Sequence, residues 1–311
     1  MDRDLLLHLP VALTVARRGG FAAAAAELGM SPSAVSHSVR FIEERIGLPL
    51  FTRTTRSVAL TEAGTFLMEG VGPALQDIRE RLERVHAVKG RASGLLRINA
   101  PSVALPIVIT PVLPEMARRF PDVRVEIYVD NAITSIVADG FDAGIRLGEL
   151  IAEDMVAVRL TSPFKAIIVA APSYLATHGR PASIADLRGH NCIAFRQIKS
   201  GGLYRWDLTE HDHDIAVDSP GSVIINDPLY ARELALAGTG LAYIFEPLVR
   251  SDIAAGRLTQ VLPQSAIEEP GLFLYFTRRA NMAPKLRAFI DTVKDVLGPT
   301  KQRRNRAKSG P

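Results

Sequence analysis

The stretch that decides the fold runs from Phe21 to Ile46 and reads FAAAAAELGMSPSAVSHSVRFIEERI. Residues 22–28 are strong helix formers, and Gly29 is a suitable residue to end a helix. Ser31 is a good N-cap, and Pro32 fits the first helical position, where its missing N–H costs nothing. The segment therefore predicts two short helices joined by a tight turn, as in a helix-turn-helix. An ordinary helical hairpin inside a core is the alternative.

The second of these helices has two opposite faces. Residues three and four apart share a face of a helix, so four apolar residues form one stripe: Val35, Val39, Ile42 and Ile46. The opposite face carries short polar side chains and one long cation: Ser33, Ser36, His37 and Arg40. An apolar back can hold the helix against a small core, while the polar front can enter a DNA major groove. The pattern therefore indicates a gene regulator.

Two short extended runs follow, Leu50–Arg53 and Ser57–Leu60, around Thr54-Thr55. They predict a small β-hairpin, or wing, that presents Arg53 and Arg56. Arginine in such a wing can reach the DNA backbone or an adjacent minor groove, where the negative potential is concentrated. Two solvated arginines on a loop are the simpler alternative.

Residues 31–64, SPSAVSHSVRFIEERIGLPLFTRTTRSVALTEAG, resemble the winged helix-turn-helix of LysR-type transcriptional regulators. The resemblance covers some sixty N-terminal residues. It implies DNA contacts from eight residues: Pro32, Ser33, Ser36, His37, Arg40, Arg53, Thr54 and Arg56. The family most often has Arg where this chain has His37, so the resemblance leaves that contact open, and a histidine there would make DNA binding depend on pH.

Length and composition limit the other possibilities. The chain has 311 residues, 47% of them hydrophobic, which predicts two to three domains with ample cores. Nothing is long and apolar enough to span a membrane, and the start, MDRDLLLHLP, lacks the features of a secretory signal. The single cysteine, Cys192, excludes an internal disulfide and any multi-cysteine metal site, and it is expected to be a buried structural thiol rather than a reactive one. We therefore expect a cytoplasmic protein.

The net charge of +4 is unevenly placed. Residues 1–91 carry +2, residues 92–300 carry −3 and residues 301–311 carry +5. The tail at 299–311 is thus basic, and it is predicted to be disordered. It could add nonspecific affinity for phosphate or simply aid solubility.

Residues 61–89 predict one long helix. Apolar residues alternate at spacings of four and three, which is the seam of a coiled coil: Val71, Leu75, Ile78, Leu82 and Val85. A helix that packs only within its own chain is the alternative. The family resemblance implies a linker helix that forms a homodimer, and precedent in the family favours a homotetramer. Two recognition helices would then read two half-sites of a duplex. Residues 90–94, GRASG, predict a flexible joint.

From residue 92 onward, predicted strands and helices alternate. Such repeats indicate α/β sheets with parallel strands, which bind ligands beyond the carboxyl ends of the strands. The predicted strands are LLRINA, VRVEIYV, FDAGIRL, AIIVAA, NCIAF and GLAYIF, with helices at about 105–119 and 133–140 among the connections.

The same region resembles the periplasmic-binding-protein-like effector domain of LysR-type regulators. The segments that carry this resemblance are GFDAGIRLGEL, APSYLATHGRP, ADLRGHNCIAFR and AGTGLAYIFEP. The resemblance implies two subdomains, the first from 92–161 with 266–298 and the second from 162–265, and a cleft between them that holds a small effector. Residues 1–60 would be the DNA-binding domain, and 61–91 the linker.

Residues at the ends of strands and the starts of helices are the candidates for contact with the effector: Ser102, Asn131, Arg146, Phe195, Arg196, Asp227 and Phe245. A helix N-terminus at Ser102, with Arg146 or Arg196, would suit an anion. The hypothesis is a small carboxylate, and an aromatic carboxylate is one candidate. The alternative is that both arginines form ordinary ion pairs.

Other clusters predict no chemistry. His211-Asp212-His213-Asp214 has the residue types of a metal site, but its position between two predicted strands favours a solvated turn. No phosphate-binding glycine loop and no nucleophile elbow occurs. We therefore expect neither enzyme activity, nor a cofactor, nor a metal.

The predicted fold is α/β with an all-α N-terminal part: a winged helix-turn-helix, a long linker helix and a two-subdomain α/β effector-binding domain. The predicted function is effector-switched transcriptional regulation. A transport-type binding protein, or an enzyme that uses the two-lobed domain, is the alternative.

Overall fold

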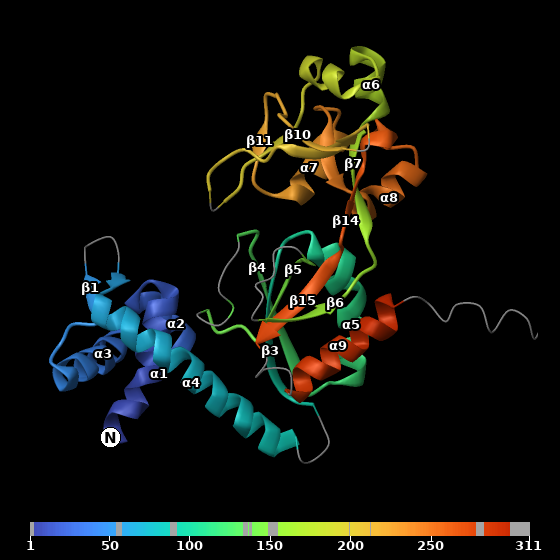
Figure 1. Ribbon diagram of the computed structural model, residues 1–311. Helices are drawn as coiled ribbons and strands as arrows, with labels where there is room; N and C mark the ends of the chain where they lie inside the picture. The colour runs from blue at the N-terminus through green and yellow to red at the C-terminus, as the bar shows by residue number, and fades with distance from the viewer. Residues whose placement is uncertain are drawn as a thin grey trace, which may run out of the picture. The chain divides into compact units, whose positions relative to one another are not determined.

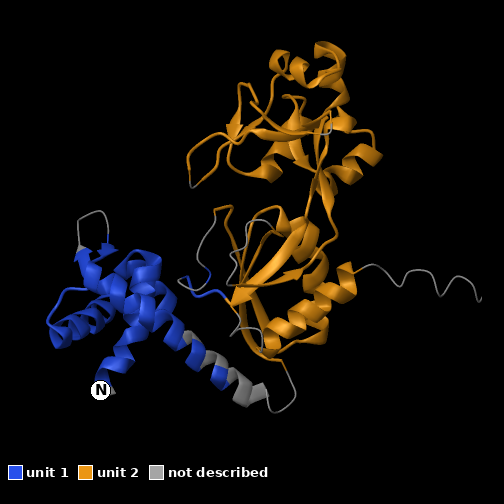
Figure 2. Ribbon diagram, viewed as in Figure 1, with its two compact units in different colours: residues 1–90, 135–141 blue, residues 91–134, 142–311 orange. Residues whose placement is uncertain are grey.

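The computed structural model describes residues 3–53, 58–87, 92–132, 136, 139–148, 155–198, 200–211, 213–277 and 283–298. The chain forms two compact units, one of residues 1–90 with 135–141 and the other of residues 91–134 with 142–311 (Figure 2). The predicted basic tail lies outside the described residues, as do residues 90–91 of the predicted joint and most of the predicted helix at 133–140. No helix within the described ranges is both long and apolar enough to cross a bilayer.

The first unit is helical, with one small hairpin (Figure 1). Its elements are α1 (Arg3–Arg18), α2 (Phe21–Leu28), α3 (Pro32–Ile46), β1 (Phe51–Arg53), β2 (Val58–Leu60) and α4 (Glu62–Ala87). The predicted turn and hairpin are confirmed: Gly29 ends α2 in the left-handed conformation, and β1 pairs antiparallel with β2. Helix α1 was not among the predicted elements. Arg17 and Arg18 at its end both form ion pairs with Glu27 of α2.

The Leu-Thr-x-x-Gly segment at 60–64 joins the hairpin to α4. The Thr61 hydroxyl accepts a hydrogen bond from the Gly64 N–H at 3.0 Å and donates one to the Pro49 carbonyl at 2.7 Å. A Cβ on Gly64 would lie 2.1 Å from the Leu50 carbonyl oxygen, so only glycine allows this approach. The Glu43 carboxylate accepts the Leu50 N–H at 2.8 Å, which fixes the same loop to α3.

The second unit contains a five-stranded sheet in the order β4-β3-β5-β15-β6. Its strands are β3 (Gly94–Ala100), β4 (Val123–Val129), β5 (Ala143–Leu147), β6 (Met155–Arg159) and β15 (Leu272–Thr277). Strand β3 runs parallel to β4 and β5, whereas β15 runs antiparallel to β5 and β6. The π-helical turn η1 (Leu105–Ile109), α5 (Thr110–Arg119) and α9 (Pro284–Leu297) pack against its apolar face.

The second sheet is built on a central strand, β7 (Phe164–Ala170). This strand pairs antiparallel with β12 (Ala242–Phe245), β13 (Thr259–Val261) and β14 (Ile267–Glu269). Two further strand pairs lie beside it: β8 (Ala194–Phe195) with β11 (Ile224–Ile225), and β9 (Trp206–Glu210) with β10 (His213–Val217). Its helices are α6 (Pro172–His178), α7 (Pro228–Leu236), α8 (Glu246–Ala254) and the short turns η3 (Ile184–Gly189) and η4 (Pro263–Ser265).

The expectation of parallel strands is therefore wrong for the sheet around β7. Alternating strands and helices predict parallel pairing only when each helix carries the chain back to the same end of the sheet. Here β14 returns beside β7 in the opposite direction, and these two strands connect the lobes that hold the two sheets (Figure 1). We propose that the boundary between the two subdomains lies in the strand pair β7–β14. The first subdomain would be residues 92–161 with 266–298, and the second would be residues 162–265.

Candidate functional site

Helix α3 has the buried face that the sequence predicts. Val35, Val39 and Ile42 are fully buried in the core of the first unit. Ile46, the fourth residue of the predicted stripe, is instead 38% exposed, because it is the last residue of the helix. Ser38 is also buried. Its hydroxyl donates to the Ala34 carbonyl at 3.0 Å, so the buried hydroxyl has a hydrogen-bond partner within its own helix.

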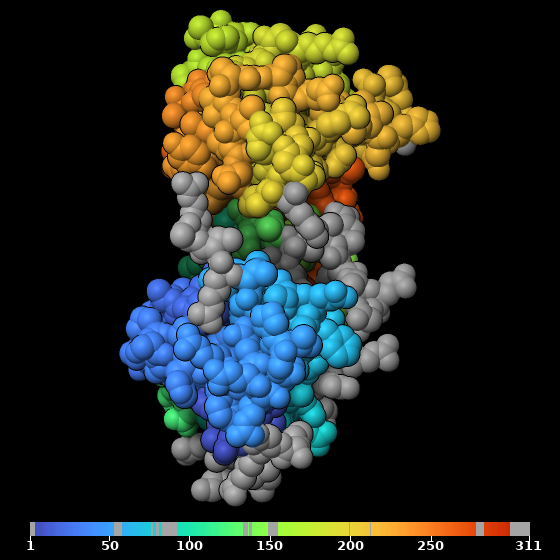
Figure 3. Space-filling view, turned by 90° about the vertical axis from the view of Figure 1, so that its left-hand side faces the viewer, coloured from blue at the N-terminus to red at the C-terminus, as the bar shows by residue number. Residues whose placement is uncertain are grey.

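The opposite face of α3 is open. The Ser31 hydroxyl caps the helix by accepting the Ala34 N–H at 3.2 Å, as predicted. Beyond the cap, four predicted contact residues are exposed and Ser36 is half-buried. The four are Pro32, Ser33, His37 and Arg40. No described acidic side chain forms an ion pair with Arg40, so its guanidinium can meet a phosphate or a base edge. The surface of α3 and the neighbouring hairpin faces the viewer in Figure 3, in blue to light blue.

The wing is described only at its base. Strands β1 and β2 pair in register from Phe51 with Leu60 to Arg53 with Val58. The Arg53 side chain and residues 54–57 lie outside the described residues, so the structure does not place the predicted contacts of Arg53, Thr54 and Arg56.

The predicted coiled-coil seam lies on helix α4, and its two halves have different surroundings. Val71 and Leu75 pack against the core of the first unit. Ile78 and Leu82 are 54% and 57% exposed, and the Val85 side chain lies outside the described residues. The N-terminal half of the seam thus packs within its own chain, whereas Ile78 and Leu82 present apolar surface.

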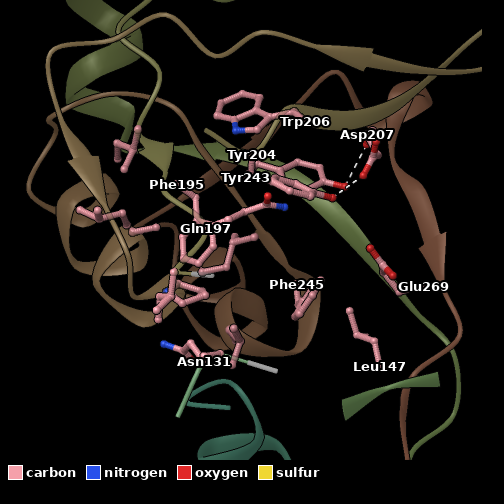
Figure 4. Close-up of a pocket in the computed structure, with 18 of the residues that line it drawn as sticks. Asn131, Leu147, Phe195, Gln197, Tyr204, Trp206, Asp207, Tyr243, Phe245 and Glu269 are labelled. Carbon is pink, nitrogen blue, oxygen red and sulfur yellow. Dashed lines mark hydrogen bonds between the residues drawn. The ribbon is translucent and has the colours of Figure 1, made fainter. Parts of the chain in front are cut away.

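A cavity of about 600 Å³ lies in the second unit. Most of its lining comes from the lobe around β7, and Asn131, Ala132 and Leu147 come from the lobe of the five-stranded sheet. Aromatic side chains form much of the wall (Figure 4). They are Phe195, Tyr204, Trp206, Tyr243 and Phe245.

The structure brings three of the seven predicted effector residues to this cavity, namely Asn131, Phe195 and Phe245. Two others lie in a hydrogen-bonded cluster with Asn131. The Ser102 N–H donates to Oδ1 of Asn131 at 2.8 Å, and the Ser102 hydroxyl donates to Oδ1 of Asp227 at 2.9 Å. The same Asp227 oxygen caps α7 by accepting the Leu229 N–H.

The two predicted arginines do not line the cavity. Arg146 is 3% exposed and donates to the carbonyls of Ile145 and Ala132 and to Oδ1 of Asn99. Burial lowers the pKa of Arg146, and the nearby Tyr275 and Asp130 partly offset this. Arg196 is exposed and donates to the Gly201 carbonyl at 2.6 Å. Neither arginine forms the ion pair that was the alternative hypothesis, within the part of the chain that the structure describes.

Apart from Asn131, the polar groups that line the cavity were not among the predicted residues. The Tyr204 hydroxyl donates to the Asp207 carboxylate, and the Tyr243 hydroxyl donates to the Asp207 carbonyl at 2.9 Å. Burial and the Asp207 bond raise the pKa of Tyr204, so it remains a neutral donor. Glu269, 9% exposed, supplies a second carboxylate. The one available signal was the alternation of Tyr243 with Phe245 and of Tyr204 with Trp206, which places each pair on one side of an extended segment.

Two other predictions concern the second lobe. His211 is a turn residue that directly follows β9, and the antiparallel strand β10 begins at His213, as expected for a hairpin. No group of three metal-ligating side chains occurs within the described ranges. Cys192 is fully buried, and burial raises the pKa of its thiol to about 12, in agreement with a structural role.

Comparisons with known proteins agree with this architecture. A family model for the LysR substrate binding domain matches residues 89–298, and one for the bacterial regulatory helix-turn-helix protein, lysR family, matches residues 6–65. The chain belongs to the LysR family of transcriptional regulators. It therefore combines a DNA-binding helix-turn-helix with an effector-binding domain, as the sequence predicts.

Individual relatives support the family assignment. The uncharacterized HTH-type regulator YcaN of Escherichia coli K12 is 39% identical over 280 residues, which cover 90% of this chain and 91% of that protein. PgrR of the same organism is 34% identical, with 94% and 98% covered. The structure of CrgA, a LysR-type regulator from Neisseria meningitidis, is similar with a TM-score of 0.61 at 27% identity, and covers 94% of this chain and 98% of that one.

The GFD-x-x-IR-x-G segment, residues 140–148, carried part of the resemblance to the LysR family. Its residues make contacts that stabilise the fold. Asp142 accepts the Arg97 N–H at 2.8 Å and forms a buried ion pair with Lys285 of α9 at 3.0 Å. A Cβ on Gly148 would lie 2.6 Å from the Phe273 ring. The segment therefore holds the five-stranded sheet together and, through the bond from Arg146 to the Ala132 carbonyl, supports the cavity wall.

Proposed function

We propose that α3 reads operator DNA in the major groove through Pro32, Ser33, Ser36, His37 and Arg40, with additional contacts from Arg53, Thr54 and Arg56 of the wing. The observation that carries this proposal is the two-sided character of α3. Three of its apolar residues are fully buried, while Arg40 on the opposite face is exposed and has no described ion-pair partner. Such a regulator would act in the cytoplasm, where bacterial DNA lies.

DNA binding can be tested by selecting duplexes from genomic fragments and measuring fluorescence anisotropy over a salt series. Arg40→Ala should weaken binding and lower the salt slope by roughly one, because one phosphate or base contact is lost. Arg188→Ala is the matched control, since Arg188 is an exposed arginine of the second unit. Equal affinities for wild type and Arg40→Ala would exclude α3 as the reading helix.

We also propose that the C-terminal half of α4 forms a homodimer, and that two dimers pair into a homotetramer. Ile78 and Leu82 lie four positions apart on one face and are more than half exposed, which suits a second helix. The double variant Ile78→Glu/Leu82→Glu should dissociate the dimer in sedimentation velocity experiments. Val71→Ala provides the contrast, because it should lower stability without changing the oligomeric state.

The effector, we propose, binds in the cavity described above and acts there as a ligand rather than as a substrate. Asn131 both lines the cavity and contacts Ser102, which is bonded to the other lobe at Asp227. An occupant can therefore favour one arrangement of the lobes and change DNA affinity through it. Reciprocity requires operator DNA to change effector affinity by the same factor, so coinciding effector titrations with and without DNA would refute this coupling.

The carboxylate hypothesis can be tested at the two predicted arginines. In the described arrangement Arg146 is already bonded to three oxygens and Arg196 points to a loop carbonyl. A carboxylate effector would have to displace these bonds. If Arg146→Ala and Arg196→Ala leave ligand affinity unchanged, the effector does not use either guanidinium as its counterion.

A further inference from the structure

The wall of the cavity contains an unpaired hydrogen-bond donor, the indole N–H of Trp206. Trp206 lines the cavity and is 1% exposed, yet its Nε1 donates no hydrogen bond within the part of the chain that the structure describes. A buried indole N–H normally has a partner, because a buried donor without one is costly. An unpaired donor in the wall therefore indicates which kind of group an occupant presents to it.

The indole nitrogen faces the space of the cavity. The fully enclosed side-chain atoms that lack a hydrogen bond in the described structure belong to Asn99, Arg146 and Ser219. The Trp206 nitrogen also lacks one but is not among these enclosed atoms, so it borders open space, and the cavity is the space that Trp206 lines. In Figure 4 this nitrogen lies on the edge of the indole that faces the other lining side chains.

Packing holds the indole in this orientation. Trp206 belongs to a buried apolar cluster that includes Leu208 and Val261. It also stacks on Tyr243, with ring centroids 5.7 Å apart and planes inclined by 19°. An N–H lies in the plane of its own ring, so the nearly parallel Tyr243 ring does not receive this one. The donor is therefore preorganised for a ligand and loses little conformational freedom when it binds.

A second donor lies nearby in the wall. Oε1 of Gln197 accepts the Ser200 hydroxyl at 2.8 Å, which leaves the Gln197 NH2 group without a hydrogen bond among the described residues. Indole and amide N–H groups are neutral donors, and a carbonyl oxygen is a neutral acceptor with two lone pairs. A carboxylate oxygen would also accept these bonds, but a carboxylate removed from water needs a counterion as well.

The rest of the wall suits an apolar molecule that carries a ring. Aliphatic and phenyl side chains line much of it, among them Ile193, Phe195, Ile225, Ile244, Phe245 and Leu248. The volume of about 600 Å³ lies within the range of small-molecule sites. Aromatic rings in such a wall favour an aromatic ligand, because offset and edge-to-face contacts between rings add to the burial of apolar area.

We infer that the effector is a small aromatic compound whose carbonyl oxygen accepts a hydrogen bond from the indole N–H of Trp206. This inference rests on the proposed function, because it names the chemical class of the ligand of that same cavity. It assigns Trp206 the role of a specificity-determining residue. The indole selects for an acceptor through its N–H, while the apolar wall contributes affinity for the ring.

Trp206 makes the inference directly measurable, because it is the single tryptophan of the chain. Full-length protein labelled with nitrogen-15 tryptophan gives one indole N–H signal in a proton–nitrogen correlation spectrum. Acetophenone and ethylbenzene share a carbon skeleton and a phenyl ring, and differ in the carbonyl oxygen. Saturation with acetophenone should move the indole proton downfield and slow its exchange with solvent. Ethylbenzene should cause a smaller shift, since both probes carry the same ring current.

Trp206→Phe tests the donor, because phenylalanine keeps an aromatic ring and lacks the N–H. In calorimetric titrations this variant should lose about fivefold in acetophenone affinity, and less than about twofold in ethylbenzene affinity. The comparison of the two probes separates the lost hydrogen bond from any change in packing. Tyr174→Phe is the matched control, because it removes a buried hydroxyl that accepts the Asn191 N–H at 2.9 Å in the same lobe. Tyr174 is not part of the described lining, so this control should keep both affinities.

Four results would overturn the inference: a flat acetophenone titration, equal indole shifts with both probes, equal losses of both affinities in Trp206→Phe, or tighter binding of benzoate than of acetophenone. The indole shifts of the wild-type protein decide the matter alone if Trp206→Phe does not fold.

Anisotropy with selected DNA, measured on the same samples, tests the proposed function separately. If acetophenone binds with the expected indole shift but leaves DNA affinity unchanged, the ligand class stands and the coupling of the cavity to DNA fails. If DNA affinity responds to benzoate and not to acetophenone, the switch stands and the ligand class is wrong.

Discussion

The hydroxyl of Ser102 donates a hydrogen bond of 2.9 Å to Oδ1 of Asp227, although the two residues are 125 positions apart in the chain. Ser102 follows β3 of the five-stranded sheet, whereas Asp227 caps α7 of the other lobe. Asn131 joins the same cluster, since it accepts the Ser102 N–H and donates to the Asn226 carbonyl at 3.4 Å. One cluster thus connects a residue of the cavity wall to both lobes.

Ser102→Ala should loosen this connection. The hydroxyl is buried and makes a hydrogen bond to a carboxylate, so its loss should cost about 1–2 kcal/mol of the free energy of unfolding in urea. Ser219→Ala is the control, because the Ser219 hydroxyl is buried without a hydrogen-bond partner in the described structure. That control should be neutral or slightly stabilising. Equal effects of the two substitutions would show that the Ser102 bond contributes nothing to stability.

Gly64→Ala should destabilise the DNA-binding unit. The new Cβ would lie 2.1 Å from a backbone oxygen that cannot move without disturbing the base of the wing. We expect a loss of about 2–3 kcal/mol in thermal or chemical unfolding. Gly70→Ala in the same helix meets nothing within 4 Å, and should instead stabilise by about 0.5–1 kcal/mol. A Gly64→Ala protein with unchanged stability would mean that the approach of α4 to Leu50 is not as close as described.

The second lobe should lose stability in acid through Asp252. This fully buried carboxylate forms ion pairs with Arg232 and Arg257, both at 2.6 Å. Burial alone would raise the pKa of Asp252, but the hydrogen bonds and charges of the two arginines outweigh it and lower the pKa below the ordinary value. A carboxylate with a lowered folded pKa stabilises the fold above its unfolded pKa of roughly 4, and that stability is lost as pH falls through the folded value.

Asp252→Asn should therefore cost about 2 kcal/mol at pH 7, a value reduced because both arginines are partly exposed. The difference between variant and wild type should shrink as the pH is lowered below roughly 4. Urea unfolding from pH 7 to pH 3 measures both quantities. A difference that stays constant over this range would mean that Asp252 titrates normally in the folded protein.

Cys192 should be inert in the native protein. Burial raises the pKa of its thiol to about 12, so almost no thiolate is present at pH 7, and the side chain is fully buried. A chromogenic disulfide reagent should react only as the protein unfolds, with a rate that follows urea concentration. Rapid stoichiometric labelling in buffer alone would show that this lobe opens on the timescale of the assay.

The DNA-binding unit could be predicted largely from the sequence because its signals are local. Ser31, Pro32 and Gly29 mark helix ends within a few residues of each other, and helical periodicity separates the buried Val35 from the exposed Arg40. Local patterns did not predict the exposure of Ile46, because whether the last turn of a helix is covered depends on neighbouring elements.

The cavity was predicted less well because its parts are distant in sequence. The rule of strand ends selected Asn131, Phe195 and Phe245, which line the cavity, but it selected Arg146 as well, which does not. A residue at a strand end can point into a cleft or into the sheet's own packing, and periodicity cannot distinguish the two. Asp207 and Glu269 lie in segments whose approach depends on β14 pairing with β7, which no local signal predicts.

By itself, the sequence determined the two helices of the helix-turn-helix, six strands of the α/β domain, which face of α3 is apolar, and that the chain combines a helix-turn-helix with an α/β effector-binding domain. These features follow from propensity, capping and periodicity, which act over a few residues. Only the tertiary structure decided that Arg146 packs beneath the cavity wall, that β7 has antiparallel neighbours, and that acidic and aromatic side chains line one cavity. Burial and charge at such a site arise from contacts between residues far apart in the chain, so they exist only once the sheets have paired.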